Sequence, residues 1–235
     1  AKLPGIEAEG LFSHFATADE ASLSKAKAQR ERFKSFVAML EARGINIPIK
    51  HINNSAGIMN FDEHFDMCRM GIILYGLYPS AEVEKSLLSI KPCLQWTTHI
   101  SHIKTLEPGR EISYGGTYVT TKETRVATVP VGYADGYPRC LSNKGKVIVN
   151  GKFAPIIGRV CMDQFMIDVS GIEAELEDKV TLVGTDGGLT LSMEEVSKAA
   201  YSFNYELPSR IARRVPRTYY SGGKLIFATN YMYGE

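Results

Sequence analysis

The feature that most constrains this chain is a change in residue pattern near residue 93. Before it, short apolar runs alternate with helical repeats, whereas after it most segments alternate apolar and polar residues. A β-α-β order favours an α/β domain with a parallel sheet or barrel, and closely spaced short strands favour an all-β domain. We therefore expect an α/β domain over residues 1–92 and a β domain over residues 93–235, with residues 78–92 as the linker.

Three short apolar runs in the first domain are predicted as parallel strands, at residues 11–15, 47–52 and 70–75. After the first run, apolar residues from Phe33 to Leu40 repeat at helical spacing, and this helix is predicted to end at Gly44. An eight-unit barrel needs about 200 residues or more. The expected fold class is therefore α/β plus all-β: the second half of a (β/α)8 TIM-type barrel, whose first half would lie upstream, followed by the β domain.

In the second domain, Asn150 and Gly151 separate two alternating runs and form the strongest short hairpin signal. Further strands are predicted at residues 160–169 and 180–183. One helix is predicted after a capping box, in which Ser192 and Glu195 cap the first turn reciprocally.

Charge and cysteine content exclude several classes of protein. The 235 residues carry a formal net charge of +1, which gives no electrostatic basis for binding nucleic acid or an acidic membrane. The apolar runs are too short to span a bilayer, and no secretory leader is visible. The four cysteines form no CxxC pair, which argues against a zinc site and suits reduced thiols in a cytoplasm.

In a parallel barrel, active-site residues lie at the carboxyl ends of strands. His14 ends the first predicted strand, Asn54 and Ser55 follow the second, and residues 69–72 surround the third. A lone histidine in this position is more often structural. Asn-Ser before a helix is usually an N-cap, although its free N–H groups and hydroxyl also suit an anion. These residues alone leave both interpretations open.

Three segments of the second domain are unusual for plain strands, namely residues 112–118, 129–137 and 158–164. In the first segment, Tyr114 stands next to two glycines. The second segment contains both turn-forming residues and tyrosines, and the third has the charged residues Arg159 and Asp163 within an otherwise apolar stretch. Each segment is also compatible with ordinary turns and bulges that place tyrosines at the edge of the core.

Taken in order, the unusual segments of both domains resemble the alanine racemase family over almost the whole chain. The matching stretches are HFATAD (14–19), NNSAG (53–57), RMGIILYG (69–76), ISYGGTY (112–118), VPVGYADGY (129–137), GRVCMDQ (158–164) and RRVPR (213–217). The resemblance implies a homodimer in which each active site combines the barrel of one subunit with the β domain of the other. It also implies alanine as substrate and pyridoxal 5′-phosphate (PLP) as cofactor, held by a lysine near the family's amino terminus.

The resemblance further implies roles for individual residues. Arg69 would face the pyridine nitrogen of PLP, and His14 would lie against the ring and connect Arg69 with the catalytic tyrosine. That tyrosine would be Tyr114, contributed by the partner subunit. The phosphate side of the cofactor would be lined by Asn54, Ser55, Gly71 and Ile72, and the substrate mouth by Tyr133, Met162 and Asp163.

These roles fit the chemistry of racemisation. A racemase removes and returns a proton on opposite faces of Cα, so two bases, here a lysine and a tyrosine, must straddle the substrate. A phenol becomes a base where cations favour the phenolate, which a chain of Tyr114, His14 and Arg69 would supply. An arginine does not give up a proton, so the pyridine ring would stay unprotonated and would be a weaker electron sink than in transaminases.

Two departures from the family pattern matter. No lysine here stands in the cofactor-lysine context, so the lysine is expected outside this chain and the chain alone is expected to be inactive. Arg213 stands where the family often has a phosphate-contacting tyrosine, and it is either a phosphate ligand of another kind or a solvated side chain. A serine or broad-specificity racemase and an inactive truncated dimerisation module stay open as alternatives, whereas PLP decarboxylases share the architecture but not these segments.

Overall fold

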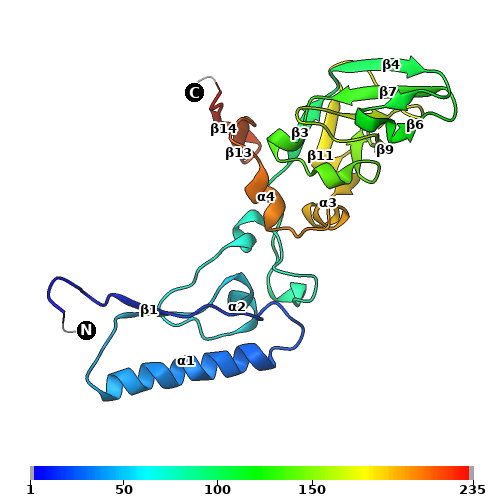
Figure 1. Ribbon diagram of the computed structural model, residues 1–235. Coiled ribbons are helices and arrows are strands. Elements are labelled where there is room, and N and C mark those ends of the chain that lie inside the picture. Colours follow the sequence, from blue (N-terminus) through cyan, green and yellow to red (C-terminus); the bar gives the residue numbers. More distant parts are fainter. Residues whose placement is uncertain (1–2, 233–235) are drawn as a thin grey trace. The chain divides into compact units, whose positions relative to one another are not determined.

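The structure is a computed structural model that describes residues 3–232, and the chain divides into two compact units between Cys93 and Leu94. The first unit contains a two-stranded parallel sheet of β1 (Gly10–Phe12) and β2 (Ile49–His51), which places Phe12 opposite His51. The long helix α1 (Ser24–Ala42) connects these strands, and the short helix α2 (Ser55–Asn60) follows β2 (Figure 1). This β-α-β-α order agrees with the prediction.

Local sequence explains how these helices begin and end. The chain leaves α1 through Arg43 and then Gly44, whose φ of 71° is a conformation that glycine adopts without strain. Helix α2 begins at Asn54, whose side-chain oxygen accepts a hydrogen bond from the Gly57 N–H at 3.0 Å. The core of the unit lies between the sheet and the helices and consists of Phe15, Ala18, Ala26, Phe33, Ile52, Ala56 and Phe61.

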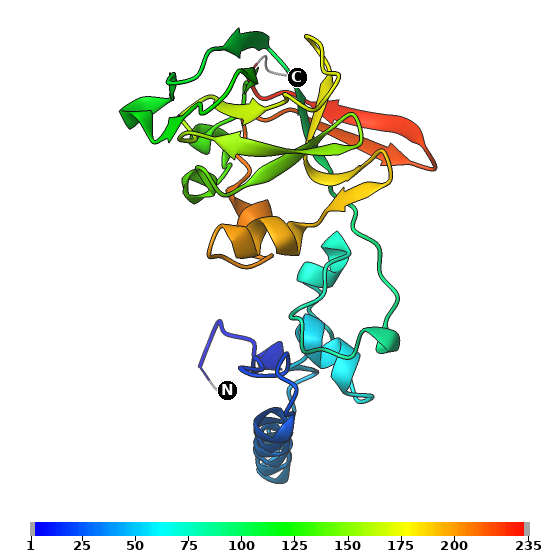
Figure 2. The same cartoon turned by 90° about the vertical axis from the view of Figure 1, so that its right-hand side faces the viewer.

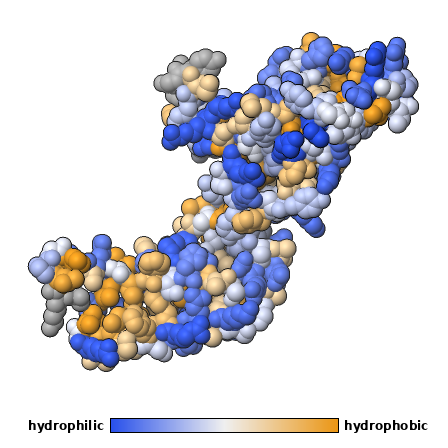
Figure 3. All heavy atoms as spheres, viewed as in Figure 1, coloured by the Kyte–Doolittle hydropathy of each residue, from blue (hydrophilic) through white to orange (hydrophobic). Residues whose placement is uncertain are grey.

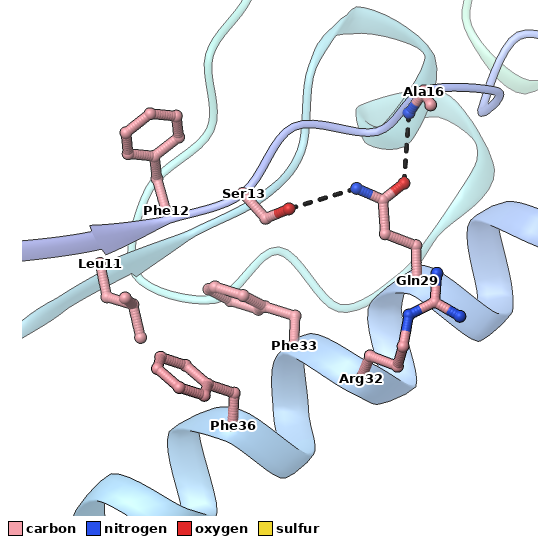
Figure 4. Close-up of a pocket in the computed structure, with 8 residues that line it drawn as sticks. All are labelled: Leu11, Phe12, Ser13, Ala16, Gln29, Arg32, Phe33 and Phe36. Atoms are coloured by element: carbon pink, nitrogen blue, oxygen red, sulfur yellow. Dashed lines mark hydrogen bonds between the residues drawn. The ribbon is translucent and has the colours of Figure 1, made fainter.

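One face of the first unit leaves apolar side chains uncovered. Leu11 and the exposed Phe36 line an open groove of about 560 Å³ between β1 and α1, beside the buried Phe33 (Figure 4). Figure 3 shows apolar side chains gathered on this unit, over β1 and α1. Strands of a parallel sheet are normally buried on both faces and paired on both edges. Among residues 3–232, however, β1 pairs with β2 alone.

The expected third strand at residues 70–75 is wrong. The structure instead places a 3-10 helix, η1 (Ile72–Tyr75), in this run. Gly76 ends it with a φ of 69°, and a Cβ atom at this glycine would lie 1.7 Å from the backbone oxygen of Lys91. The chain therefore turns at Gly76, where its backbone lies close to that of residue 91.

The second unit is built around an eight-stranded antiparallel sheet (Figure 2). Seven of its strands follow the order β12-β11-β8-β9-β10-β7-β4, and β3 pairs with β11. The strands are β3 (Trp96–His99), β4 (His102–Leu106), β7 (Thr124–Val129), β8 (Lys146–Val149), β9 (Lys152–Ile157), β10 (Phe165–Asp168), β11 (Lys179–Asp186) and β12 (Leu189–Leu191). Their inward residues, such as Ile148, Phe165 and Leu182, are fully buried, so this unit has a core of its own.

The structure confirms the hairpin predicted in the second domain and confirms the predicted helix and strand in part. Asn150 and Gly151 connect β8 to β9 with φ values of 48° and 70°, as the hairpin prediction requires. Helix α3 (Met193–Ala199) has one half of the predicted capping box, because the Ser192 side chain accepts a hydrogen bond from the Glu195 N–H. The Glu195 carboxylate pairs with Lys146 at 2.8 Å. The strand predicted at residues 160–169 is shorter, because only Phe165–Asp168 form β10. Residues 158–164 form a loop instead.

The remaining elements lie at the edges of this unit. They are β5 (Glu111–Ile112), which pairs with β6 (Tyr118–Val119), the helix α4 (Glu206–Arg210), and the exposed hairpin of β13 (Arg217–Ser221) and β14 (Lys224–Thr229). Within residues 3–232, no helix is long and apolar enough to cross a membrane, and no cluster of potential metal ligands is present.

Candidate functional site

A partly buried network in the first unit is centred on Arg69. Its Nη2 atom donates to the backbone oxygens of Ser13, at 2.8 Å, and Ile52, at 3.4 Å, and lies 3.3 Å from His14 Nδ1. Its Nη1 atom contacts Nδ1 of His51. Because these partners come from the ends of β1 and β2, the two parallel strands fix a permanent cation at their carboxyl edge.

His14 and Asn54 extend this network toward α2. Nε2 of His14 lies 3.2 Å from Nδ2 of Asn54, and Oδ1 of Asn54 caps the helix at Gly57. The His14 ring is solvent-exposed, whereas Asn54 is half-buried. One imidazole therefore contacts the fixed guanidinium with one nitrogen and the helix cap with the other.

Two further predicted residues meet at the start of α2. The Gly71 N–H donates to the buried Ser55 hydroxyl at 2.9 Å, and Ile72 follows as a buried residue of η1. This bond joins the N-terminus of α2 to the Gly71–Ile72 backbone, and the Ser55 hydroxyl, which accepts it, keeps a proton of its own to donate. Such donors suit an anion.

His51 is a member of the network that the sequence analysis missed. Its ring stacks on Phe12, with ring centroids 5.7 Å apart, and contacts Arg69. Burial, together with the neighbouring Arg69 charge, holds the pKa of His51 below its usual value. The rule that identified His14 at the end of the first strand could also have found His51, because it is the last residue of β2.

The second unit carries an open depression of about 900 Å³ lined by predicted residues. Tyr114 lies at its rim with 75% of its surface exposed, and Tyr133, Met162 and Asp163 line the same hollow. Tyr114 belongs to a short 3-10 turn, η3 (Tyr114–Gly116), and Tyr133 to another, η4 (Tyr133–Asp135). The structure therefore brings together four residues that lie up to 49 positions apart in the sequence.

Close backbone contacts hold this depression in shape. The N–H groups of Tyr133 and Ala134 donate to the oxygens of Cys161 and Met162, each at 3.0 Å. A Cβ atom at Gly132 would lie 2.2 Å from the Met162 oxygen, so the approach of the two segments requires glycine at this position.

Arg214 is a second residue that the sequence analysis did not assign. Its Nε atom donates to the buried Asp135 carboxylate and its Nη2 atom to Asp163, each at 2.6 Å. The Asp135 carboxylate also accepts from the Gly132 N–H at 2.8 Å. These hydrogen bonds, first to Asp135 and then to Asp163, raise the pKa of the Arg214 guanidinium above its ordinary value. The signal in the sequence was the RRVPR stretch, of which only Arg213 was assigned a role.

Arg213 itself is exposed, and its guanidinium lies over the ring of Tyr231, 5.4 Å from the ring centre. Both of these residues belong to the second unit.

Comparisons with known proteins identify the family. A family described as "Alanine racemase, C-terminal domain" matches residues 93–219, and one described as "Alanine racemase, N-terminal domain" matches residues 1–79. This chain belongs to the alanine racemase family. The alanine racemase of Clostridium tetani is 47% identical to it over 234 residues, which cover 98% of this chain and 60% of that protein. The alanine racemase of Halothermothrix orenii is 48% identical over 219 residues, or 92% of this chain and 58% of that protein.

Solved alanine racemases have the same fold. An alanine racemase from Bacillus anthracis with bound L-Ala-P superposes with a TM-score of 0.94 at 41% identity and covers 98% of this chain and 60% of that chain. The Clostridium difficile 630 alanine racemase in complex with cycloserine gives a TM-score of 0.91, also at 41% identity, over 98% of this chain and 61% of that one. The chain thus spans about 60% of the length of the alanine racemases that it matches.

Proposed function

We propose that this chain contributes to a PLP-dependent alanine racemase that interconverts L- and D-alanine by a two-base mechanism. The observation that carries the proposal is the anchoring of Arg69 at the carboxyl edge of β1 and β2, with His14 in contact. Membership of the alanine racemase family supports it independently. The second base, a lysine, lies outside this chain in the proposal, and the working enzyme is a homodimer in the cytoplasm.

The donor set of the first unit fits PLP. Arg69 offers a fixed N–H group to a ring nitrogen, and it keeps its proton because a guanidinium group is not deprotonated in proteins. The Ser55 hydroxyl and the Gly71 N–H, which bond to each other in this structure, would turn to a phosphate as donors, with Asn54 and Ile72 beside them. When bound, PLP would withdraw electrons from the substrate and make its Cα proton acidic.

In this proposal, the residues of the second unit act on the substrate. Tyr114 holds or accepts the proton on one face of Cα, and its exposed phenol at the rim of the depression is accessible for that role. Tyr133, Met162 and Asp163 shape the substrate mouth. Arg213 is proposed as a phosphate ligand, because a guanidinium can donate two hydrogen bonds to a phosphate.

The test uses the longest product of the gene that encodes this chain, purified with and without added PLP. We expect a visible absorption band from the bound cofactor and formation of D-alanine from L-alanine, measured with a D-amino-acid oxidase assay. Tyr114→Phe should lower turnover by about 100- to 10,000-fold, the usual cost of losing a general base. Tyr118→Phe, outside the proposed site, is the matched control. A product that takes up no PLP would contradict the proposal.

Serine is the competing substrate for the same site. Comparing kcat/KM for L-alanine and L-serine decides between an alanine racemase and a serine or broad-specificity racemase, because both would use the same bases. If the encoded product ends at the present 235 residues and neither substrate turns over, the chain is an inactive dimerisation module.

A further inference from the structure

Ser113, the residue before Tyr114, has an unusual backbone conformation. Its φ and ψ angles are 65° and −177°, a combination that is essentially restricted to glycine. The two positions after Tyr114 also have positive φ values, 76° at Gly115 and 53° at Gly116, and both are glycines. Of these three positions with positive φ, Ser113 alone has a side chain, and it therefore has a strained backbone.

The Ser113 side chain ties this segment to the loop at residues 158–164. Its hydroxyl donates to the backbone oxygen of Arg159 at 2.9 Å and lies 3.3 Å from the sulfur of Cys161. The backbones are close here as well, since a Cβ atom at Gly158 would lie 2.9 Å from Cβ of Ser113. The tie joins the turn that carries Tyr114 to the loop that carries Met162 and Asp163.

We propose that Ser113 is a positioning residue, which holds the Tyr114 phenol in one orientation against the 158–164 loop. This inference rests on the proposed function, in which Tyr114 handles a substrate proton. Strained backbone persists where its surroundings over-determine it, and such positions cluster at active sites. Glycine at position 113 would remove the strain but also the hydroxyl that fixes the turn. Serine supplies the hydroxyl on the smallest side chain that can carry one.

The experiment uses the full 235-residue chain with 3-fluorotyrosine in place of tyrosine. Fluorine NMR reports each tyrosine, and Tyr114→Phe identifies the Tyr114 resonance by its loss. We expect one narrow Tyr114 resonance in the parent chain, and a shifted, broadened or split one in Ser113→Gly. In parallel, peptide mass spectrometry follows alkylation of Cys161 by iodoacetamide. Its rate should rise at least fivefold in Ser113→Gly, because the Ser113 hydroxyl contacts that sulfur.

Internal and matched controls separate positioning from folding. The alkylation rates of Cys93 and Cys140 should not change, and the melting temperature of Ser113→Gly should stay within a few degrees of the parent. Ser101→Gly removes another hydroxyl that donates to a backbone oxygen, that of Thr128, and should change neither Tyr114 nor Cys161. Ser113→Ala keeps the strain without the hydroxyl and should behave like Ser113→Gly at both reporters.

Two results would overturn the proposal. One is a Tyr114 resonance and a Cys161 rate that match the parent in Ser113→Gly. The other is unfolding of both Ser113 variants, which would make the residue a requirement for folding instead. Neither readout needs cofactor or turnover, so the outcome stands whether or not the racemase proposal survives its own test.

Discussion

At the scale of single residues, two arginines organise the two sets of candidate site residues. Arg69 is held by backbone oxygens and imidazoles, so its charge stays with the first unit. Arg214 is held by two carboxylates and cross-links segments of the second unit. Planar guanidinium groups suit both tasks, because their five donors lie in a fixed geometry that satisfies several acceptors at once.

The imidazole of His51 should remain neutral at lower pH than a free histidine. Its pKa is lowered in the folded chain, first by burial and then by the charge of Arg69. The unfolded chain therefore binds this proton more readily, so the contribution of His51 to stability is present above about pH 6.5. That contribution is lost as pH falls through the folded-state pKa. Proton NMR titration of the ring should give a midpoint below 6.5, and a midpoint above 6.5 would contradict the assignment.

Replacement of Arg214 should destabilise the second unit. In Arg214→Met, Asp135 loses its charged partner while it stays buried, which typically costs about 1–3 kcal/mol of unfolding free energy. The more exposed bond to Asp163 adds little. Arg210→Met breaks an exposed i,i+4 pair with Glu206 and should cost less than about 0.5 kcal/mol. Urea unfolding of both variants measures the difference, and equal losses would refute the role of Asp135.

The sequence predicted best those side chains that form hydrogen bonds with residues nearby in the chain. The N-cap at Asn54 and the capping serine at Ser192 are local hydrogen bonds, and both are confirmed. Arg214 and His51 were missed because their partners lie on other segments, and a single sequence does not show which segments meet. The roles of Tyr114 and its neighbours remain predictions.

At the scale of elements, the turns that require positive φ values are the parts of this chain whose structure is best predicted from sequence. The Asn150–Gly151 hairpin was predicted correctly because its turn type depends on those two residues. The strand expected at residues 70–75 was wrong because a short apolar run fits a strand or a buried helical turn equally well. The structure has the helical turn, which ends at Gly76, where the backbone approaches that of Lys91.

The turn η4 should respond sharply to substitution of Gly132. A Cβ atom there would lie 2.2–2.3 Å from the backbone oxygens of Met162 and Cys161, so the two segments must separate in Gly132→Ala. Overpacking of this kind costs about 1–3 kcal/mol. Gly171→Ala is the matched control, since nothing lies within 4 Å of its added Cβ, and it should be close to neutral. Thermal unfolding compares the two, and a Gly132→Ala variant as stable as the control would show that the contact is not tight in solution.

At the scale of the whole molecule, the two units differ in how completely their sheets are covered. The second unit pairs most strands of its large sheet on both edges over a fully buried core. The first unit pairs two three-residue strands and leaves Phe36 and its neighbours in an open groove (Figure 4). Buried, paired backbone opens rarely, whereas short strands with uncovered apolar neighbours open often.

Hydrogen exchange followed by mass spectrometry should therefore separate the units in the isolated chain. We expect the slowest exchange in β8, β9 and β10, where interior residues such as Val147 and Ile167 are completely buried. We expect exchange in β1 and β2 to be faster by several orders of magnitude, because local opening there exposes few buried contacts. Addition of a second polypeptide that covers the groove should slow exchange in β1 and leave β9 unchanged. Equally slow exchange in β1 and β9 of the isolated chain, with no second polypeptide in the sample, would show that the first unit is stable with its β1 edge unpaired.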